Sequence, residues 1–199
     1  MRRVGLTGGI ATGKSTVAQI LRSEHECAVI DADAVSRTLV VPGSPALNEI
    51  QKEFGDDVIL ANGTLDRAQL RTMITADSSK REKLNEILHP RIQASTRTFL
   101  DTAEKSGAHI AFVEAALLVE VGSYKAYDSL WVVTCDNEVQ ISRLMARDTC
   151  SRSTAIAMIK TQMPQAEKCA VADTIIENNN GHRQLTDAIS KALEDELRN

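Results

Sequence analysis

The sequence predicts an α/β fold, a doubly wound and mainly parallel sheet of about five strands, on two observations. Short, fully apolar runs alternate with helical patterns along most of the chain. Such runs suit parallel strands that are buried on both faces, whereas a strand with one wet face alternates apolar and polar residues. Several runs also end in acidic residues, which places carboxylates at the carboxyl edge of the sheet.

The amino-terminal part begins with a strand, a glycine-rich loop and a helix. Residues 3–7 can form a buried strand, and residues 15–24 carry apolar side chains on one face at helical spacing. The apolar run at 27–30 predicts the second strand. A further helix is expected to begin at Ser44-Pro45, where a cap residue precedes a proline, and to end at Gly55.

Residues 56–105 contain no convincing strand and predict a helical insertion. Asn62-Gly63 is typical of a turn, and helical patterns follow at 65–75, 80–88 and 92–104. Pro90 is expected to separate the last two helices, because proline lacks the backbone N–H and clashes with the preceding turn. We therefore expect one domain of 199 residues with an insertion rather than two domains.

The carboxyl-terminal part returns to the alternating pattern. Apolar runs predict strands at 110–113, 130–133 and 174–176. Helical patterns predict helices at 137–147 and 153–163, and a last helix that ends near Leu197. This completes a doubly wound sheet.

Composition excludes several classes of protein. The net charge is −4, from 23 basic and 27 acidic residues, which argues against a broad nucleic-acid surface. No apolar stretch approaches the ~20 residues of a membrane helix, and the amino terminus does not resemble a secretory signal. We expect a cytoplasmic protein. The four cysteines and four histidines lack metal-ligand spacing, so we expect reduced thiols and no such metal site.

Residues 8–15 match the phosphate-loop pattern G-x-x-x-x-G-K-[ST]. Backbone N–H groups of such a loop surround phosphate oxygens, Lys14 adds a point charge, and the Ser15 hydroxyl can bind Mg²⁺. The alternative is a glycine-rich turn that binds nothing, but strand, loop and helix occur in the required order. The residues expected to bind the phosphates are Gly9, Ala11, Thr12, Gly13, Lys14, Ser15 and Thr16.

Acidic residues after two strands are candidates for chemistry. Asp31 and Asp33 follow the second strand, and either carboxylate could accept a proton from an attacking hydroxyl. On an extended backbone the two share a side, so spacing does not choose between them, and either could instead cap a helix beginning near Ala34. Glu114 follows the third strand and could reach Mg²⁺ through water, although solvation at the strand end explains it equally well.

A pair of arginines predicts a lid at about 140–165. Arg143 and Arg147 are four residues apart and therefore share a helical face. In a kinase that encloses ATP, such arginines close over the phosphates and stabilise the transferring charge. The alternative is an ordinary solvated face on which the arginines pair with Asp148 or Glu138.

Taken together, these residues resemble the dephospho-coenzyme A kinase family almost from end to end. The matching segments are Leu6–Ile10 with the phosphate loop, Ile30–Asp33, Val41–Leu47, Leu88–Ile92, Leu117–Glu120, Arg143–Asp148, and Gln162–Lys168 with Ala172-Asp173. The resemblance implies a P-loop nucleotide-kinase fold with a helical acceptor-binding insertion and a helical lid. It also implies transfer of the ATP γ-phosphate to the 3′-hydroxyl of the dephospho-CoA ribose, with Mg²⁺.

The resemblance also assigns roles to single residues. It makes Asp33 the base, the segment around Arg147 the lid, and the Asn178 to Gly181 loop a neighbour of adenine. We expect Lys14, Arg143 and Arg147 to act on the transferring phosphate. The residues expected to contact dephospho-CoA are Thr7, Asp33, His89 and Leu117. The family is generally small, cytoplasmic and often monomeric, so we expect a monomer.

Two departures from the family pattern stand out. Ala11-Thr12 replaces a common Gly-Ser pair, and Ala116 replaces a common proline. Alanine at position 11 satisfies the loop pattern but lacks the freedom of glycine to adopt a positive φ, so ATP affinity is expected to differ.

Two other functions compete with this assignment. One is a P-loop kinase for another small molecule, such as a nucleotide, a nucleoside or shikimate. The other is a GTPase or ATPase that transfers phosphate to water, although the sequence lacks the guanine-reading Asn-Lys-x-Asp and a switch-like Asp-x-x-Gly.

Overall fold

The computed structural model describes residues 1–198, which form two compact units. One unit comprises Met1–Asp31 and the chain from Leu100 onward, and the other comprises Ala32–Phe99. The second unit therefore begins well before residue 56, where the sequence placed the start of the helical insertion. Within residues 1–198, no helix combines the length and the apolar character needed to cross a membrane.

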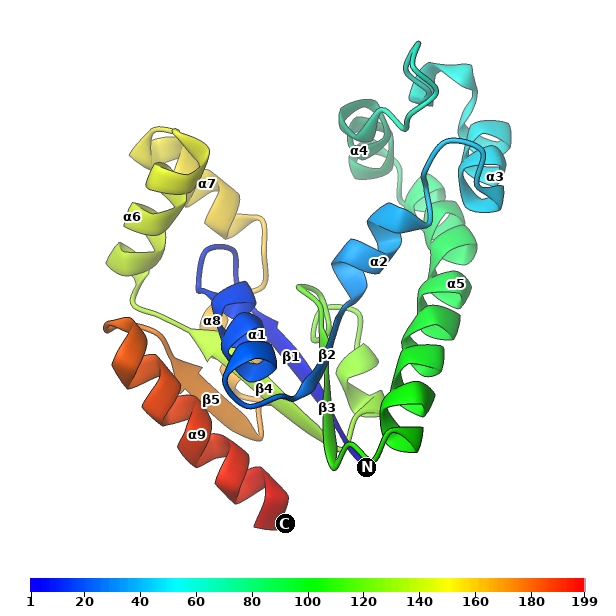
Figure 1. Cartoon of the computed structure of the whole chain (residues 1–199). Helices are drawn as coiled ribbons and strands as arrows, with labels where there is room; N and C mark the ends of the chain where they lie inside the picture. The colour runs from blue at the N-terminus through cyan, green and yellow to red at the C-terminus, as the bar shows by residue number, and fades with distance from the viewer. Residues whose placement is uncertain (199) are drawn as a thin grey trace. The chain divides into compact units, whose positions relative to one another are not determined.

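Five parallel strands form the sheet of the first unit (Figure 1). They are β1 (Arg2–Gly8), β2 (Ala28–Asp31), β3 (Ile110–Glu114), β4 (Ser129–Thr134) and β5 (Thr174–Glu177). Their order is β2-β3-β1-β4-β5, and each neighbouring pair is parallel. Every predicted strand is confirmed, and the mainly parallel sheet proves entirely parallel. Strands β2 and β3 lie on one side of β1, and β4 and β5 lie on the other. Because the strand order changes side at β1, a ligand crevice is expected at the carboxyl end of that strand.

In the described part of the first unit, besides the end of the helix that precedes β3, one helix follows β1, three lie between β4 and β5, and one follows β5. They are α1 (Lys14–Ser23), α6 (Asn137–Asp148), α7 (Arg152–Lys160), α8 (Gln165–Cys169) and α9 (His182–Arg198), with a 3₁₀ turn η2 (Ser123–Ala126). The helix predicted to reach Met163 ends at Lys160, because Pro164 disfavours helical backbone at the residue before it.

Successive side chains of β4 point to opposite faces of the sheet and pack in different apolar clusters, as strand geometry requires. Trp131 and Val133 pack in the same cluster as buried residues of α1 and α9. Leu130 and Val132 pack in a separate cluster with Leu118. The sheet is therefore covered on both faces, which explains why its strands read as continuous apolar runs.

The second unit is helical and has its own core. Its elements are α2 (Ala32–Thr38), α3 (Pro45–Phe54), η1 (Asp56–Val58), α4 (Arg67–Ala76) and most of α5 (Ser78–Lys105). The Ser44 hydroxyl caps α3 by accepting a hydrogen bond from the N–H of Leu47, and Gly55 follows the last residue of the helix, as predicted. Apolar residues of α3, α4 and α5 form one buried cluster in this unit.

The predicted break at Pro90 is wrong, because α5 continues through it. Pro90 leaves the carbonyl of Glu86, four residues earlier, without its helical donor, but contacts in the neighbouring turn hold the helix. The Arg91 guanidinium donates to the carbonyl of Ile87 at 2.5 Å and to the Glu49 carboxylate at 2.6 Å. Ile87 and Leu88 also pack against the cluster of the second unit. Tertiary packing therefore overrides the local preference of proline.

Candidate active site

The phosphate loop lies between the end of β1 at Gly8 and the start of α1 at Lys14. Gly13 adopts φ 96°, and a Cβ there would lie 2.0 Å from Nδ2 of Asn178. A Cβ at Gly8 would lie 2.6 Å from the carbonyl oxygen of Val133. Both glycines are therefore required by the close approach of neighbouring atoms, and Gly13 also by its left-handed backbone.

Ala11 adopts φ 59° in this loop, so the expectation that alanine forfeits a positive φ is wrong. The left-handed region costs an alanine roughly 1–2 kcal/mol, which the surrounding contacts offset. Thr12 supplies one such contact, because its hydroxyl donates to the carbonyl of Gly9 at 2.9 Å.

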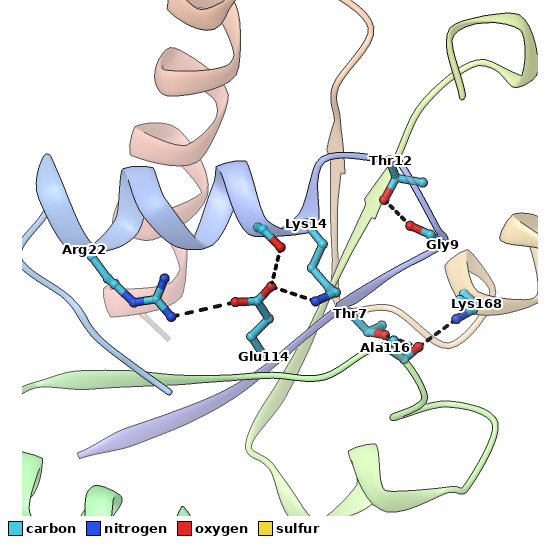
Figure 2. A network of polar contacts seen from close by, with 9 residues as sticks. Thr7, Gly9, Thr12, Lys14, Arg22, Glu114, Ala116 and Lys168 are labelled. Atoms are coloured by element: carbon cyan, nitrogen blue, oxygen red, sulfur yellow. Dashed lines mark hydrogen bonds and ion pairs between the residues drawn. The ribbon is translucent and has the colours of Figure 1, made fainter. Parts of the chain in front are cut away.

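The carboxylate of Glu114 contacts two side chains at the end of the phosphate loop, Lys14 and Ser15 (Figure 2). Its Oε1 lies 2.7 Å from the Lys14 ammonium and accepts from the Ser15 hydroxyl at 3.0 Å. Its Oε2 lies 3.7 Å from the Arg22 guanidinium. The residue is 1% exposed, so solvation does not explain its place at the strand end. One buried carboxylate therefore contacts both side chains expected to meet phosphate and Mg²⁺. Among residues 1–198, no group of three or more His, Cys, Asp or Glu side chains is arranged to hold a metal.

The two predicted lid arginines make different contacts. Arg143 donates to the carbonyl of Thr12 at 3.5 Å and to Oδ1 of Asn178 at 3.4 Å. Arg147 instead forms two hydrogen bonds with Asp148, at 2.7 and 2.9 Å, on an exposed surface. The guanidinium of Arg147 lowers the pKa of Asp148 below its usual value. Arg143 thus contacts the phosphate loop, whereas Arg147 makes one of the pairs expected of a solvated helix face.

Asn178, expected near adenine, is held by the phosphate loop. Its Nδ2 donates to the carbonyl of Thr12 at 2.9 Å, and the residue is 6% exposed. Gly181 is exposed, and a Cβ added there would meet no atom within 4 Å. Asn178 therefore supports the phosphate loop, while the expected place of Asn178 and Gly181 near adenine stays a prediction.

The carbonyl of Ala116, in the segment after β3, accepts hydrogen bonds from two side chains. The buried Thr7 hydroxyl donates to the carbonyl of Ala116 at 3.1 Å, and Lys168 donates to the same oxygen at 3.0 Å (Figure 2). Lys168 is fully buried and also lies 2.6 Å from Oε1 of Glu120. Leu117, expected at the acceptor, is 50% exposed. Thr7 and Lys168 thus fix the backbone immediately before Leu117.

A model of the dephospho-CoA kinase family matches residues 2–184. The chain belongs to the dephospho-CoA kinase family. It is 43% identical to the dephospho-CoA kinase of Geobacter sulfurreducens, with 93% of each chain covered. It is 41% identical to that of Shouchella clausii, covering 95% of this chain and 98% of the relative. Membership makes the protein an ATP-dependent phosphotransferase and sets aside the GTPase and ATPase alternatives.

Solved structures agree with this family assignment. The dephospho-CoA kinase of Campylobacter jejuni superposes with a TM-score of 0.71 and 25% identity, covering 100% of this chain and 98% of that one. A Thermus thermophilus structure gives a TM-score of 0.86 and 29% identity, covering 98% and 97%. A shikimate kinase from Bacteroides thetaiotaomicron has a TM-score of 0.52 at 15% identity, covering 97% and 96%, and shares the fold alone.

Two of the site residues predicted from the resemblance to dephospho-CoA kinases, Asp33 and His89, belong to the second unit. The extended backbone assumed from Asp31 to Asp33 is wrong, because β2 ends at Asp31 and α2 begins at Ala32. Strand alternation therefore does not govern Asp33, which lies in the first turn of α2. His89 is exposed on α5.

Sequence reasoning overlooked the polar side chains that hold the loop of this dephospho-CoA kinase family member. Gln140, Gln162 and Lys168 all contact backbone near the candidate site. The segment Gln162–Lys168 was part of the family resemblance and overlaps the predicted lid, but no role was given to its individual side chains. Glutamine and lysine side chains are mostly exposed in folded proteins, so only the structure reveals these contacts.

Proposed function

We propose that this chain transfers the γ-phosphate of ATP to the 3′-hydroxyl of the dephospho-CoA ribose and releases CoA and ADP. Family membership supports the acceptor. The observation that carries the chemistry is the contact of Glu114, the last residue of β3, with both Lys14 and Ser15 at the start of α1. Phosphoryl transfer depends mainly on positioning and charge neutralisation, which this group of residues can supply.

The phosphate loop binds the donor in this proposal. Backbone N–H groups from Gly9 to Thr16 would surround the phosphates, and Lys14 would contribute a positive charge near the β- and γ-phosphates. When ATP binds, the Lys14 ammonium would give up part of its ion pair with Glu114 and contact phosphate oxygens instead. Because Glu114 is buried, this exchange takes place largely away from water, where charge interactions are less screened.

Ser15 and Glu114 fit a magnesium ion. Their oxygens lie 3.0 Å apart, and Mg²⁺ in kinases is usually held by one or two protein oxygens together with substrate phosphates. When bound, Mg²⁺ would neutralise charge on the phosphate oxygens. Ser15 would hold it directly and Glu114 through water.

Asp33 is the proposed base for the acceptor. Its carboxylate would accept the proton of the 3′-hydroxyl as the oxygen attacks phosphorus. Thr7, His89 and Leu117 are the other residues proposed to bind dephospho-CoA. The match of Ile30–Asp33 to the family pattern supports this role. Arg143 and Arg147 would stabilise the transferring charge, and the Asn178 to Gly181 loop would lie near adenine.

The wider properties of the protein are also part of the proposal. We infer one domain over residues 1–199, with a helical insertion at about 56–105 and a lid at about 140–165. The chain acts as a monomer in the cytoplasm.

A panel of acceptors tests this function. ADP release is measured with purified protein, ATP and Mg²⁺ in the presence of dephospho-CoA, shikimate, adenosine or water alone. We expect stimulation by dephospho-CoA and a product phosphorylated on the 3′-oxygen. No stimulation by dephospho-CoA together with turnover of another hydroxyl compound would refute the proposal.

A further inference from the structure

Both backbone groups of Ile10, within the phosphate loop, are bound by glutamine side chains. The N–H of Ile10 donates to Oε1 of Gln162 at 2.7 Å. The carbonyl of Ile10 accepts from Nε2 of Gln140 at 2.7 Å. The glutamines come from α6 and from the segment after α7, both within the predicted lid region. One residue of the loop is therefore held at both its polar groups by side chains far along the chain.

The orientation of the Gln140 amide is fixed by a third glutamine. Its Oε1 accepts from Nε2 of Gln165 at 2.8 Å, which leaves Nε2 of Gln140 as the donor to Ile10. Gln165 in turn accepts from the N–H of Cys135 at 3.2 Å and from the hydroxyl of Thr134. Gln140 is 1% exposed, so loss of its bond would leave polar groups buried without partners.

The bound residue lies beside the strained part of the loop. Ala11 follows it at φ 59°, and both Ile10 and Ala11 pack against the apolar cluster of α6 and α7. A Cβ added to Gly9 would lie 3.1 Å from Nε2 of Gln140. Gln140 therefore approaches the loop so closely that glycine is favoured at position 9.

We propose that Gln140 and Gln162 are positioning residues for ATP. By holding Ile10 at its N–H and its carbonyl, they keep the left-handed turn at Ala11 and present the following N–H groups to the phosphates. The loop is thereby organised before ATP binds, and less of the binding free energy is spent on ordering it. The proposal rests on ATP binding at the loop and not on the identity of the acceptor.

The two glutamines play opposite hydrogen-bonding roles, which gives a sharp test. Gln162 acts as an acceptor, so Gln162→Glu keeps the bond whereas Gln162→Leu removes it. A carboxylate beside the loop also repels phosphate, so any advantage of glutamate over leucine comes from the retained acceptor. Gln140 acts as a donor, so Gln140→Glu and Gln140→Met both remove the bond. The exposed Gln184→Leu on α9 is the matched control.

ATP affinity is measured by calorimetry without acceptor, and KM values for ATP and dephospho-CoA are measured separately. We expect Gln162→Leu and Gln140→Met to weaken ATP binding by about three- to tenfold, as loss of one hydrogen bond implies. The KM for dephospho-CoA should change less than about twofold on the same reasoning. Gln162→Glu should recover only part of the ATP affinity, because its carboxylate keeps the acceptor but repels phosphate, and Gln184→Leu should match the unaltered protein.

Normal ATP affinity in Gln162→Leu overturns the proposal. Circular dichroism confirms that each variant is folded. If Gln140→Met fails to fold, Gln162→Leu still decides the question. Because affinity is measured without acceptor, a failure here is distinct from a failure of the proposed acceptor.

Discussion

The Lys14 ammonium lies 2.7 Å from Oε1 of Glu114, and the glutamate is almost completely buried. This pair joins the phosphate loop to the end of β3, two segments about a hundred residues apart. Removing one member of a buried pair leaves the other charge without compensation. Glu114 is therefore the residue at which structure and proposed chemistry can be tested together.

Glu114→Gln should lower kcat by about 10- to 100-fold at fixed Mg²⁺ and raise the Mg²⁺ concentration needed for half-maximal rate. The neutral amide no longer compensates Lys14 or attracts a hydrated cation. Steady-state rates over a magnesium titration measure both effects. Glu53→Gln, at an exposed acid on α3, serves as the control and should leave the titration unchanged. An unchanged magnesium dependence in Glu114→Gln would remove this residue from the metal site.

Asp33→Asn should lower kcat by at least ~10²-fold while ATP still binds, because the amide does not accept the proton of the hydroxyl. Asp31→Asn is the matched variant, since the sequence left the two acids equivalent. Rates at saturating substrates and ATP affinity are measured for both. Should Asp31→Asn lose the activity and Asp33→Asn keep it, the base would be Asp31.

Arg147→Ala should reduce kcat by about 10²-fold with a smaller effect on acceptor binding, if this arginine leaves Asp148 to stabilise the transferring phosphate. Asp148→Asn is the control, because it removes the partner of the exposed pair and keeps the guanidinium. That variant should retain its kcat. A change in thermal stability alone for Arg147→Ala would assign the residue to an ordinary helix face.

The sheet was predictable from the sequence because its strands are buried on both faces and therefore appear as separate apolar runs. The phosphate loop was predictable because its pattern is local in sequence and its backbone requires glycine, as the φ of 96° at Gly13 shows. Pro90 misled the prediction because the contacts that hold α5 come from residues distant in sequence, such as Glu49. The contacts of Gln140 and Gln162 with Ile10 were not predicted for the same reason, because these glutamines are 130 and 152 residues away from Ile10 in sequence.

Ala11→Gly should stabilise the protein by up to about 1 kcal/mol, because glycine adopts φ 59° without the penalty of a Cβ. Gly43→Ala is the reverse experiment. Gly43 has φ 81° and open space around it, so alanine there should destabilise by about 1 kcal/mol through backbone strain alone. Denaturant unfolding measures both changes. A loss of stability in Ala11→Gly would mean that the packing of the Ala11 methyl outweighs the strain.

Glu196→Leu should destabilise the protein by about 3 kcal/mol, because it removes a buried acceptor from several donors at once. Oε2 of Glu196 accepts from Nε1 of Trp131 at 2.7 Å and from the hydroxyl of Ser129 at 2.9 Å, which ties α9 to β4. Arg2 donates to the other oxygen. Unfolding in guanidinium chloride is followed by circular dichroism and by the fluorescence of Trp131, the single tryptophan of the sequence.

Glu194→Leu, at an exposed position of the same helix, is the control and should change stability by less than about 0.5 kcal/mol. Equal effects of the two substitutions would show that the buried hydrogen bonds contribute nothing beyond the helix itself.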